Sequence, residues 1–373
     1  MSDVHVNEAI KYFLIPGELK AIHPFKVGHI NETYISVWGQ GAHEKRYLHQ
    51  MVNKSVFKDV PAVMENIEKV IAHIKRKRGI DTRETMTIIP STDGRSYIQD
   101  QHGEYWRTYE FIEDTINYEV CTEPRQAYEA AKVMGRFLTY LSDCPASAYH
   151  ETIPLFQNVP NRFVQLDEAM SKDSQGRCKQ ARKETQFATA RREHAALVEN
   201  LHTQGKVPRR VTHSDPKFNN VLFKTVPSNG NGVNYGEGLV VVDLDTVMPG
   251  TMLYDFGDLA RSVVVATAED EVDLAKVTVN EELFGELVRG YLEATCGVLT
   301  ADEIAQMHLA PRLIALSLGV RFLTDFLNGD VYFKIHRLTH NLDRARTQFR
   351  IVSEMEKAEA RMQAVVARYS KAG

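Results

Sequence analysis

The sequence contains few cysteines, and their spacing does not suggest a metal or redox site. The four cysteines are Cys121, Cys144, Cys178 and Cys296, widely separated in a chain of 373 residues, with no Cys-x-x-Cys pair and no Cys/His cluster. Such spacing predicts free thiols in a reducing compartment rather than a disulfide framework. The sequence therefore gives no support to a small, disulfide-stabilised fold or to a zinc site.

Long apolar runs and a large excess of one charge are also missing. No segment approaches the roughly 20 apolar residues of a membrane span, and the first residues lack the basic-then-apolar pattern of a secretory signal. The formal net charge is only −4, without the basic field typical of nucleic-acid binding. We therefore expect a cytoplasmic protein without nucleic-acid or membrane partners. The sequence predicts nothing about its oligomeric state.

What is present describes an ordinary globular protein, with 43% hydrophobic and 25% charged residues. The length favours two lobes or domains rather than one core. Strand-like runs dominate the first 113 residues and helical patterns dominate the rest. The expected elements of the first part are a helix at 6–13, strands at 21–27, 33–38 and 46–52, a helix at 57–77, and strands at 86–89, 97–99 and 105–112. We place the lobe boundary at 113/114.

After residue 120 the chain is predicted to be mostly helical. The expected helices cover 127–141, 179–202, 281–293, 301–327 and 342–367. Near the middle of this part, Asp255 is expected either to fix the metal loop, which precedes it in the sequence, by hydrogen bonds or to cap a helix. The basic residues 75–78 before Gly79 suit a helix C-terminus, and a nucleic-acid patch is the alternative interpretation.

The clearest chemical pattern begins after an apolar approach at Val211. His213, Asp215 and Asn220 form a His-x-Asp-x-x-x-x-Asn spacing. Phosphoryl transfer needs a carboxylate that accepts the proton of the attacking hydroxyl, and an amide oxygen that helps to hold Mg²⁺. The spacing predicts Asp215 as the base and Asn220 as a metal ligand. Taken alone, it is equally compatible with a turn that carries Asx caps.

A second pair of carboxylates favours the catalytic interpretation. The apolar run 239–242 leads directly to Asp243 and Asp245, so a strand delivers two carboxylates at one end. Hard Mg²⁺ prefers a few carboxylate oxygens together with phosphate oxygens and water. We predict Asp243 and Asp245 as metal ligands, with Asp243 the principal one.

Four residues of the first part are candidates for nucleotide binding. Gly28 lies in a turn whose backbone N–H groups could cover phosphates, although an ordinary hairpin is the simpler interpretation. Gln50 occupies the place on the third strand where kinases normally carry a phosphate-binding lysine, so the positive charge must come from elsewhere, chiefly Mg²⁺. Glu110 and Ile112 lie where the strand enters the connector, and their backbone groups could contact adenine. A helix glutamate, Glu65 or Glu68, would lie behind the site.

The chain resembles bacterial N-acetylhexosamine 1-kinases, within the aminoglycoside/choline kinase-like phosphotransferases. The matching segments are Gly28–Asn31, Thr33–Tyr34, Tyr47–Gln50, Trp106–Arg107, Phe111–Glu113, Arg210–His213, Lys217, Asn219–Asn220, Val242–Thr246, Met248–Gly250, Leu253–Asp258, Arg321–Leu323, Gly329–Asp330 and Tyr332–Phe333. The Asp-Leu-Asp-Thr-x-Met-Pro-Gly string is more specific than the catalytic loop, which many kinases share. Gln50 also matches this group, so the missing lysine does not argue for an inactive protein.

The resemblance implies an α+β, protein-kinase-like bilobal fold, with an N-terminal antiparallel sheet lobe that carries a helix and a mainly helical C-terminal lobe. It implies ATP and Mg²⁺ as cofactors and transfer of the γ-phosphoryl group to the anomeric hydroxyl of a free N-acetylhexosamine. It further implies His29, Arg321 and Tyr332 as sugar contacts beside Asp215. From the residues alone, Arg321 could equally be a helix-surface residue and Tyr332 a core aromatic.

Three other functions remain open. The same chemistry could act on choline, an aminoglycoside or another small alcohol, although a cationic acceptor calls for an acidic or aromatic cage. The fold could also be a catalytically silent nucleotide-binding module, against which the intact Asp215, Asn220 and Asp243 argue. A protein kinase is disfavoured because no Gly-x-Gly-x-x-Gly loop and no Ala-Pro-Glu segment occurs. The preference between gluco and galacto sugars is not predicted.

Overall fold

The structure, a computed structural model, describes residues 2–25, 30–40, 43–226 and 235–371. The chain divides into two compact units, each built from segments that are not contiguous in sequence. The first unit consists of Met1–Ile116, Ser147–Pro154 and Leu222–Met248, and the second of Asn117–Ala146, Leu155–Val221 and Pro249–Gly373.

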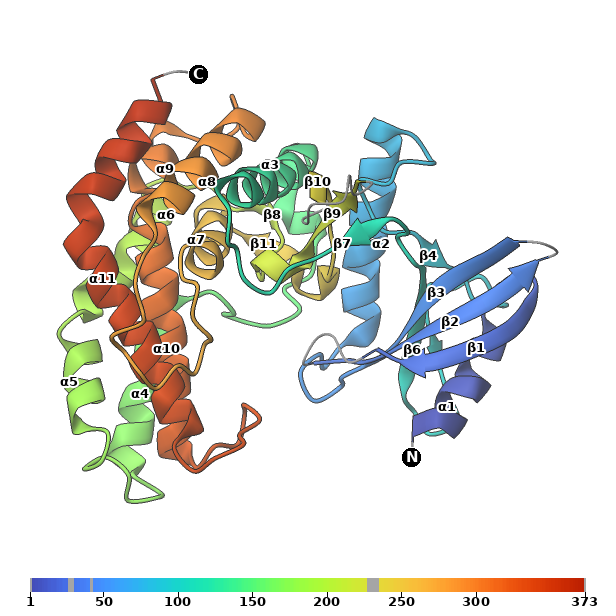
Figure 1. The fold of residues 1–373 in the computed structure, drawn as a ribbon. Coiled ribbons are helices and arrows are strands. Elements are labelled where there is room, and N and C mark those ends of the chain that lie inside the picture. Colours follow the sequence, from blue (N-terminus) through green and yellow to red (C-terminus); the bar gives the residue numbers. More distant parts are fainter. Residues whose placement is uncertain (1, 26–29, 41–42, 227–234, 372–373) are drawn as a thin grey trace. The chain divides into compact units, whose positions relative to one another are not determined.

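An antiparallel sheet forms the framework of the first unit (Figure 1). In the described residues its strand order is β1-β2-β3-β6-β4, and β5 pairs with β6. The strands are β1 (Glu18–Pro24), β2 (Glu32–Gln40), β3 (His43–Val52), β4 (Ile88–Ile89), β5 (Ile98–Gln99) and β6 (Tyr105–Glu110). The register of β3 and β6 places Gln50 opposite Arg107. The predicted sheet lobe is confirmed.

Helix α2 (Val60–Arg78) is the principal helix of this unit. The Asp59 side chain caps its start by accepting from the Ala62 N–H at 3.1 Å, and Gly79, with φ of 100°, ends it. Every apolar position of the predicted helical period is buried: Val60, Val63, Met64, Ile67, Val70, Ile71 and Ile74. The basic residues 75–78 form its last turn, as the helix-terminus interpretation requires.

The smaller elements of the first unit lie at its start and after the connector. They are α1 (Ser2–Ala9), the 3-10 helix η1 (Ile10–Tyr12), β7 (Thr115–Ile116), β9 (Val221–Thr225), β10 (Tyr235–Val241) and the 3-10 turn η5 (Leu244–Thr246). Strand β9 lies between β10 and β7 in a three-stranded sheet. Strand β10 leads to the predicted metal residues Asp243 and Asp245, because only Val242 and Asp243 separate it from η5.

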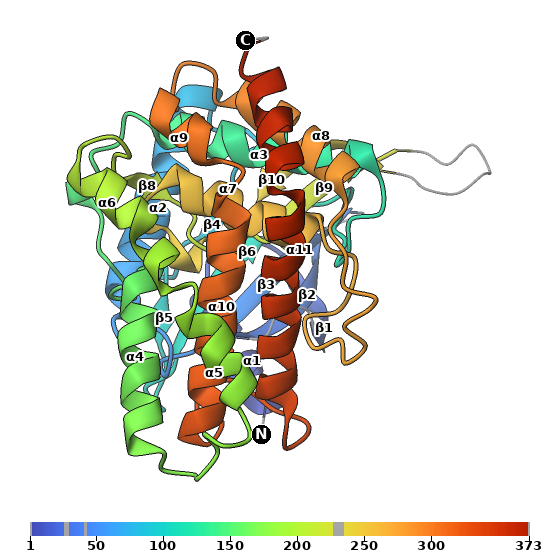
Figure 2. The same cartoon turned by 90° about the vertical axis from the view of Figure 1, so that its left-hand side faces the viewer.

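The second unit is mainly helical, as predicted (Figure 2). Its helices are α3 (Pro124–Leu141), α4 (Val159–Lys172), α5 (Arg182–Thr189), α6 (Leu197–Thr203), α7 (Met252–Val263), α8 (Glu281–Ala294), α9 (Ala301–Gln306), α10 (Ala310–Asn328) and α11 (His340–Tyr369), with 3-10 turns η3 (Arg192–Ala196) and η4 (Phe218–Asn220). The 3-10 turn η2 (Ala146–Ala148) lies where the chain passes from the second unit to the first. Strand β8 (Arg210–Thr212) pairs with β11 (Met248–Gly250). Helix α3 packs against α8, and α10 packs against both α7 and α11.

The prediction of one long helix over 179–202 is wrong. The structure has α5, η3 and α6 in its place. Arg191 leaves the helical conformation, with φ of −113° and ψ of 7°. Its guanidinium donates to Glu356 on α11 at 2.8 Å and lies over the Phe187 ring. These tertiary contacts favour the break over the local propensity for a continuous helix.

The predicted helix over 301–327 is also interrupted. Helix α9 ends at Gln306 and α10 begins at Ala310, with Pro311 in its first turn. Proline has no N–H to donate to the preceding turn, so it suits a helix start rather than a helix interior. Helix α4 was not predicted, and α7 was indicated only by the helix-cap interpretation of Asp255. Across the described ranges, no helix combines the length and apolar character needed to cross a bilayer.

Candidate active site

The predicted catalytic loop follows β8 in the second unit and is held by a buried carboxylate. Asp255, fully buried on α7, accepts the main-chain N–H of His213 at 2.7 Å and of Ser214 at 2.9 Å. Burial raises the pKa of Asp255 from 3.8 to about 7. Thr251, and not Asp255, caps the start of α7. Asp255 therefore does fix a loop by hydrogen bonds, but it is the predicted catalytic loop and not the metal loop that the sequence interpretation named.

The two hydrogen bonds hold the loop in an unusual conformation. Ser214 has φ of 67°, in the left-handed region that non-glycine residues rarely adopt. Gln157 Nε2 also donates to the Ser214 carbonyl at 2.9 Å. The residue before Asp215 is thus fixed at both its N–H and its carbonyl, so the direction of the following carboxylate is determined by the surrounding helices.

Asp215 is partly exposed and has a cation beside it. Lys217 Nζ lies 2.9 Å from Asp215 Oδ2. The surrounding protein disfavours the lysine charge, but the carboxylates of Asp215 and Asp258 outweigh this effect and raise the pKa of Lys217. Sequence reasoning assigned Lys217 no role, although its place two residues after the predicted base was the available signal.

Asn220 lies in the 3-10 turn η4, in the same unit as Asp215. Its Nδ2 donates to the Asp215 main-chain carbonyl at 3.0 Å. The amide group is thereby oriented, and Oδ1 is the atom that it can offer to a metal ion. The second unit thus brings Asp215, Lys217 and Asn220 together on one short segment.

The two aspartates of the first unit differ sharply. Asp243 is exposed and has φ of 63° and ψ of 60°, a left-handed conformation that aspartate tolerates better than most residues. Asp245 is only 3% exposed and is paired inside the unit. We predicted both as metal ligands. Their surroundings suit Asp243 to that role and Asp245 to a structural one.

Asp245 belongs to a polar cluster in which it and Arg107 are buried, whereas Asn31 and Gln50 are half-buried. Arg107 Nη2 lies 2.5 Å from Asp245 Oδ1, and Asn31 Nδ2 donates to Asp245 Oδ2 at 2.7 Å. Arg107 Nε and Nη2 donate to Gln50 Oε1 at 3.0 and 2.8 Å. Burial opposes the charge of Arg107, but Asp245 outweighs it and raises the pKa of Arg107. We call these four residues the Arg107 cluster.

Neither helix glutamate contacts this cluster. Glu65 is exposed and pairs with Lys69 at 2.6 Å and His150 at 2.7 Å, and Glu68 is also exposed. The residue of α2 that meets Arg107 is Met64, whose Sδ lies 3.7 Å from Nη1. Arg107 was missed because a strand arginine at a buried position gives no sequence signal of its own.

The remaining nucleotide candidates are placed only in part. Glu110 donates its N–H to the Thr87 carbonyl at 2.9 Å, so its own carbonyl is the group it can offer to adenine. The Ile112 carbonyl accepts the Thr115 hydroxyl at 2.6 Å, so its N–H is the corresponding donor. Gly28 and His29 lie outside the described residues.

The predicted sugar contacts Arg321 and Tyr332 lie close together in the second unit. Arg321, on α10, lies over the rings of Phe156, Tyr332 and Phe333 at 5.4 to 5.8 Å from their centres. Tyr332 is 57% exposed, so it is not the core aromatic that the sequence alone allowed.

A buried carboxylate holds the loop that carries Tyr332. Asp325 accepts the main-chain N–H groups of Val331, Tyr332 and Phe333 at 2.8 to 3.0 Å. It also accepts Asn341 Nδ2 at 2.9 Å. These bonds fix the main chain that carries the Tyr332 and Phe333 rings relative to α10. The Asp325 carboxylate thus accepts four hydrogen bonds.

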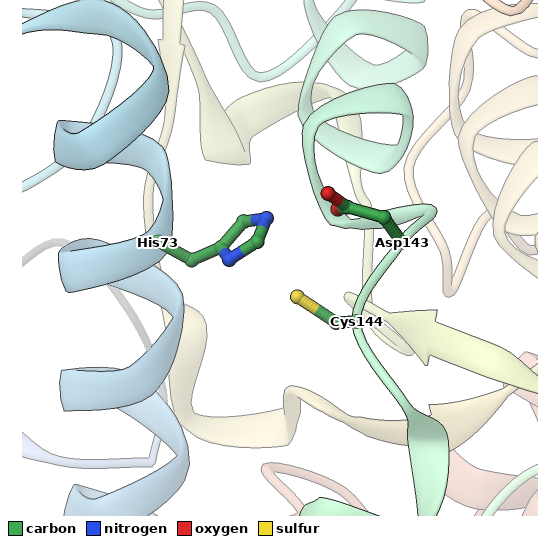
Figure 3. A group of neighbouring side chains, drawn as sticks. All are labelled: His73, Asp143 and Cys144. Carbon is green, nitrogen blue, oxygen red and sulfur yellow. The ribbon is translucent and has the colours of Figure 1, made fainter.

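Figure 3 shows a further group of potential ligands, His73, Asp143 and Cys144. His73 lies on α2 of the first unit, whereas Asp143 and Cys144 follow α3 in the second. The three residues therefore do not form a metal site within either unit.

Comparison with known proteins identifies the family. A model of the phosphotransferase enzyme family matches residues 22–292, which is more than half of the chain. The chain belongs to this phosphotransferase family. The match spans the strand that carries Gln50, the catalytic loop and the Asp243 segment, so it covers the residues on which the phosphoryl-transfer prediction depends.

Solved structures agree in fold at low identity. A microcompartment-associated aminopropanol kinase is 14% identical, with a TM-score of 0.60 over 97% of this chain and 99% of that one. A spectinomycin phosphotransferase, solved with ADP and spectinomycin, is 13% identical, with a TM-score of 0.55 over 96% and 99%. A choline/ethanolamine kinase family protein from Mesorhizobium loti is 14% identical, with a TM-score of 0.53 over 98% and 99%. The phosphotransferase thus has the α+β, kinase-like fold that the sequence predicted.

Proposed function

We propose that this phosphotransferase transfers the γ-phosphoryl group of ATP to the anomeric hydroxyl of a free N-acetylhexosamine. In this proposal residues 1–113 supply the nucleotide-binding lobe, and residues 114–373 supply the catalytic and acceptor-binding residues. The family and the ADP-bound relative support the nucleotide. The acceptor is supported by the surroundings of Arg321.

The proposed base is Asp215. Its carboxylate accepts the proton of the anomeric hydroxyl as the sugar oxygen bonds to the γ-phosphorus and the bond between that phosphorus and the bridging oxygen of ADP breaks. Lys217, 2.9 Å from Asp215, contributes a positive charge near the transferring group, where negative charge must be stabilised. The anomeric hydroxyl is more acidic than an ordinary alcohol, so a carboxylate base can assist its deprotonation near neutral pH.

Each unit offers an oxygen ligand of the kind that Mg²⁺ prefers. Asp243, in the first unit, offers an exposed carboxylate, and Asn220, in the second, offers an oriented amide oxygen. When bound, Mg²⁺ would neutralise charge on the nucleotide phosphates. In this proposal buried Asp245 is not a metal ligand but a member of the Arg107 cluster.

The observation that carries the acceptor assignment is the positive charge around Tyr332. Burial, and then the nearby charge of Arg321, lowers the pKa of Arg162 to about 10, so two guanidinium groups act on the same region. The nearby carboxylates are already engaged: Asp325 by four donors, and Asp330 by Arg177 and Asn341. Such a region suits a neutral polyol with carbonyl and hydroxyl oxygens, such as an acetamido sugar.

The second candidate keeps the chemistry and changes the acceptor. Two of the similar structures are named for aminopropanol and for choline or ethanolamine, which are cationic at neutral pH. A cationic acceptor requires carboxylates or an open aromatic cage. Here Arg321 already lies over the aromatic rings, so a cation would meet like charge.

A screen of ADP release separates these candidates. The acceptors are N-acetylglucosamine, N-acetylgalactosamine, glucose, galactose and choline, each with the wild type and with Asp215→Asn as the matched inactive control. We expect turnover with the N-acetylhexosamines and little with choline. Preferred turnover of choline would replace the sugar kinase by an amino-alcohol kinase. No turnover with any acceptor, together with tight ADP binding, would favour the silent module.

A further inference from the structure

The Arg107 cluster lies in the first unit, where kinases usually place a lysine on the third strand and a glutamate on the helix behind it. Gln50 replaces that lysine, and the two glutamates of α2 at the corresponding place are exposed and do not contact it. The only guanidinium that contacts Gln50 in the described residues comes from β6, directly opposite in the sheet register.

We propose that Arg107 is a positioning residue that orients Gln50 toward the nucleotide phosphates and holds the Asp243 loop in its metal-binding conformation. The inference rests on the proposed kinase function. It assigns to one buried arginine two tasks that a lysine–glutamate pair performs elsewhere, and it takes the acidic partner from the metal-binding segment itself rather than from a helix.

The orientation of Gln50 follows from its hydrogen bonds. Its Oε1 receives both Arg107 Nε and Nη2, so its amide nitrogen must point to the opposite side. There the nitrogen makes one long contact, 3.3 Å, with Thr33 Oγ1. The half-buried amide can therefore donate a further hydrogen bond, and the adjacent guanidinium strengthens it as a donor to an anion.

Arg107 acts on the conformation of Asp243 through Asp245. Only Leu244 separates the two aspartates, and both lie in or next to the tight turn η5. Arg107 and Asn31 hold one Asp245 oxygen each, which fixes the turn from inside the unit. The left-handed φ of Asp243 needs support of this kind, because surrounding structure must hold a residue in a sparsely populated conformation.

The burial of Arg107 distinguishes a positioning role from direct binding of a phosphate. Arg107 is 1% exposed and all its described contacts are internal, so a phosphate cannot reach its guanidinium without displacing Gln50 or Asp245. Arg107 therefore acts through these two residues, and its removal is expected to weaken metal-dependent nucleotide binding more than metal-free binding.

The test measures ADP affinity by calorimetry, with Mg²⁺ and with EDTA, alongside the thermal midpoint. Loss of residues that orient metal ligands typically weakens metal affinity about 10- to 100-fold, and we expect Arg107→Met to weaken MgADP binding in this range while ADP binding in EDTA changes less. Arg95→Met is the control: it removes an exposed arginine that lies between β4 and β5 and pairs with Asp93, and it should bind as the wild type does.

Arg107→Met leaves Asp245 buried without its cation and can fail to fold. The double variant Arg107→Met/Asp245→Leu removes both charges, and a buried ion pair replaced by apolar groups is often neutral in stability. We expect it to regain the thermal midpoint but not the MgADP affinity. Arg107→Lys keeps the positive charge but loses the paired Nε and Nη2 hydrogen bonds to Gln50. It should bind MgADP about 10-fold more weakly.

A double variant with wild-type MgADP affinity would show that the pair is merely structural and would overturn the proposal, as would wild-type affinity in Arg107→Lys. Wild-type protein that binds no MgADP would overturn the proposed kinase function together with this inference. Wild-type binding with unaltered variants would overturn the Arg107 inference alone.

Discussion

The sharpest prediction for the second unit concerns Asp255, a fully buried residue that fixes the proposed catalytic loop. Asp255→Asn preserves the shape of the side chain but can accept only one of the two N–H groups of His213 and Ser214. A buried N–H left unsatisfied costs about 1–3 kcal/mol. We therefore expect the substitution to lower the free energy of unfolding by about that amount.

The catalytic effect should exceed the stability effect. Ser214 no longer has two fixed bonds to maintain its left-handed conformation, and the Asp215 carboxylate that follows it can shift. A displacement of about 1 Å at a catalytic group can cost on the order of 10²-fold in rate. We expect kcat to fall by this factor while the affinity for MgADP, measured by calorimetry, changes little.

Urea unfolding, steady-state kinetics with N-acetylglucosamine and ADP calorimetry provide the three readouts. Ile351→Val is the matched control, since it loses one methylene in the core of the same unit, a change that typically costs about 0.5–1.5 kcal/mol, and it should keep the wild-type kcat. A stable Asp255→Asn with a kcat within twofold of the wild type would refute the positioning role of Asp255.

Three further predictions follow from the same residues. Asp215→Asn should lower kcat by about 10² to 10⁴-fold, the usual contribution of a general base, with ATP affinity retained; near-full kcat would remove Asp215 from that role. Asp243→Ala should abolish the Mg²⁺ dependence of nucleotide binding, and a calorimetric titration equal to the wild type would reject the ligand assignment. The folded pKa of Asp255, about 7, lies above its ordinary 3.8, so between these values the folded state binds the extra proton and wild-type stability falls as pH rises through this window. The loss is at most about 4 kcal/mol at 1.36 kcal/mol per pH unit; it should be absent in Asp255→Asn, and an identical pH slope in urea unfolding would contradict this assignment.

The sequence was sufficient for the features that depend on local pattern. The period of apolar residues in α2, its basic last turn and Gly79 predicted the helix and its end. The strand-like runs before residue 113 predicted the strands of the first part, and the resemblance implied that they form the antiparallel sheet that the structure shows. The motif spacing predicted the phosphotransferase class, because His-x-Asp-x-x-x-x-Asn followed by a strand and two aspartates is the order that phosphoryl transfer needs, and the family match confirms this class.

The sequence was insufficient where a residue's role depends on a partner far along the chain. Asp243 and Asp245 follow the same strand in the sequence, and the burial of Asp245 and its contacts with Asn31 and Arg107 distinguish it from Asp243 in the structure. The break at Arg191 likewise depends on Glu356, 165 residues later. No local propensity encodes such pairs, so the pattern-based prediction joined α5 and α6 into one helix.

The central claim is that the phosphotransferase acts on the anomeric hydroxyl, and the product identifies that hydroxyl directly. The measurement is ³¹P NMR of a reaction with ATP and N-acetylglucosamine or N-acetylgalactosamine, repeated with the 1-O-methyl glycoside of the same sugar. The proposal predicts a phosphate coupled to the anomeric proton of the free sugar, and no product from the glycoside, whose reacting hydroxyl is blocked. A 6-phosphate product, or phosphorylation of the methyl glycoside, would contradict it.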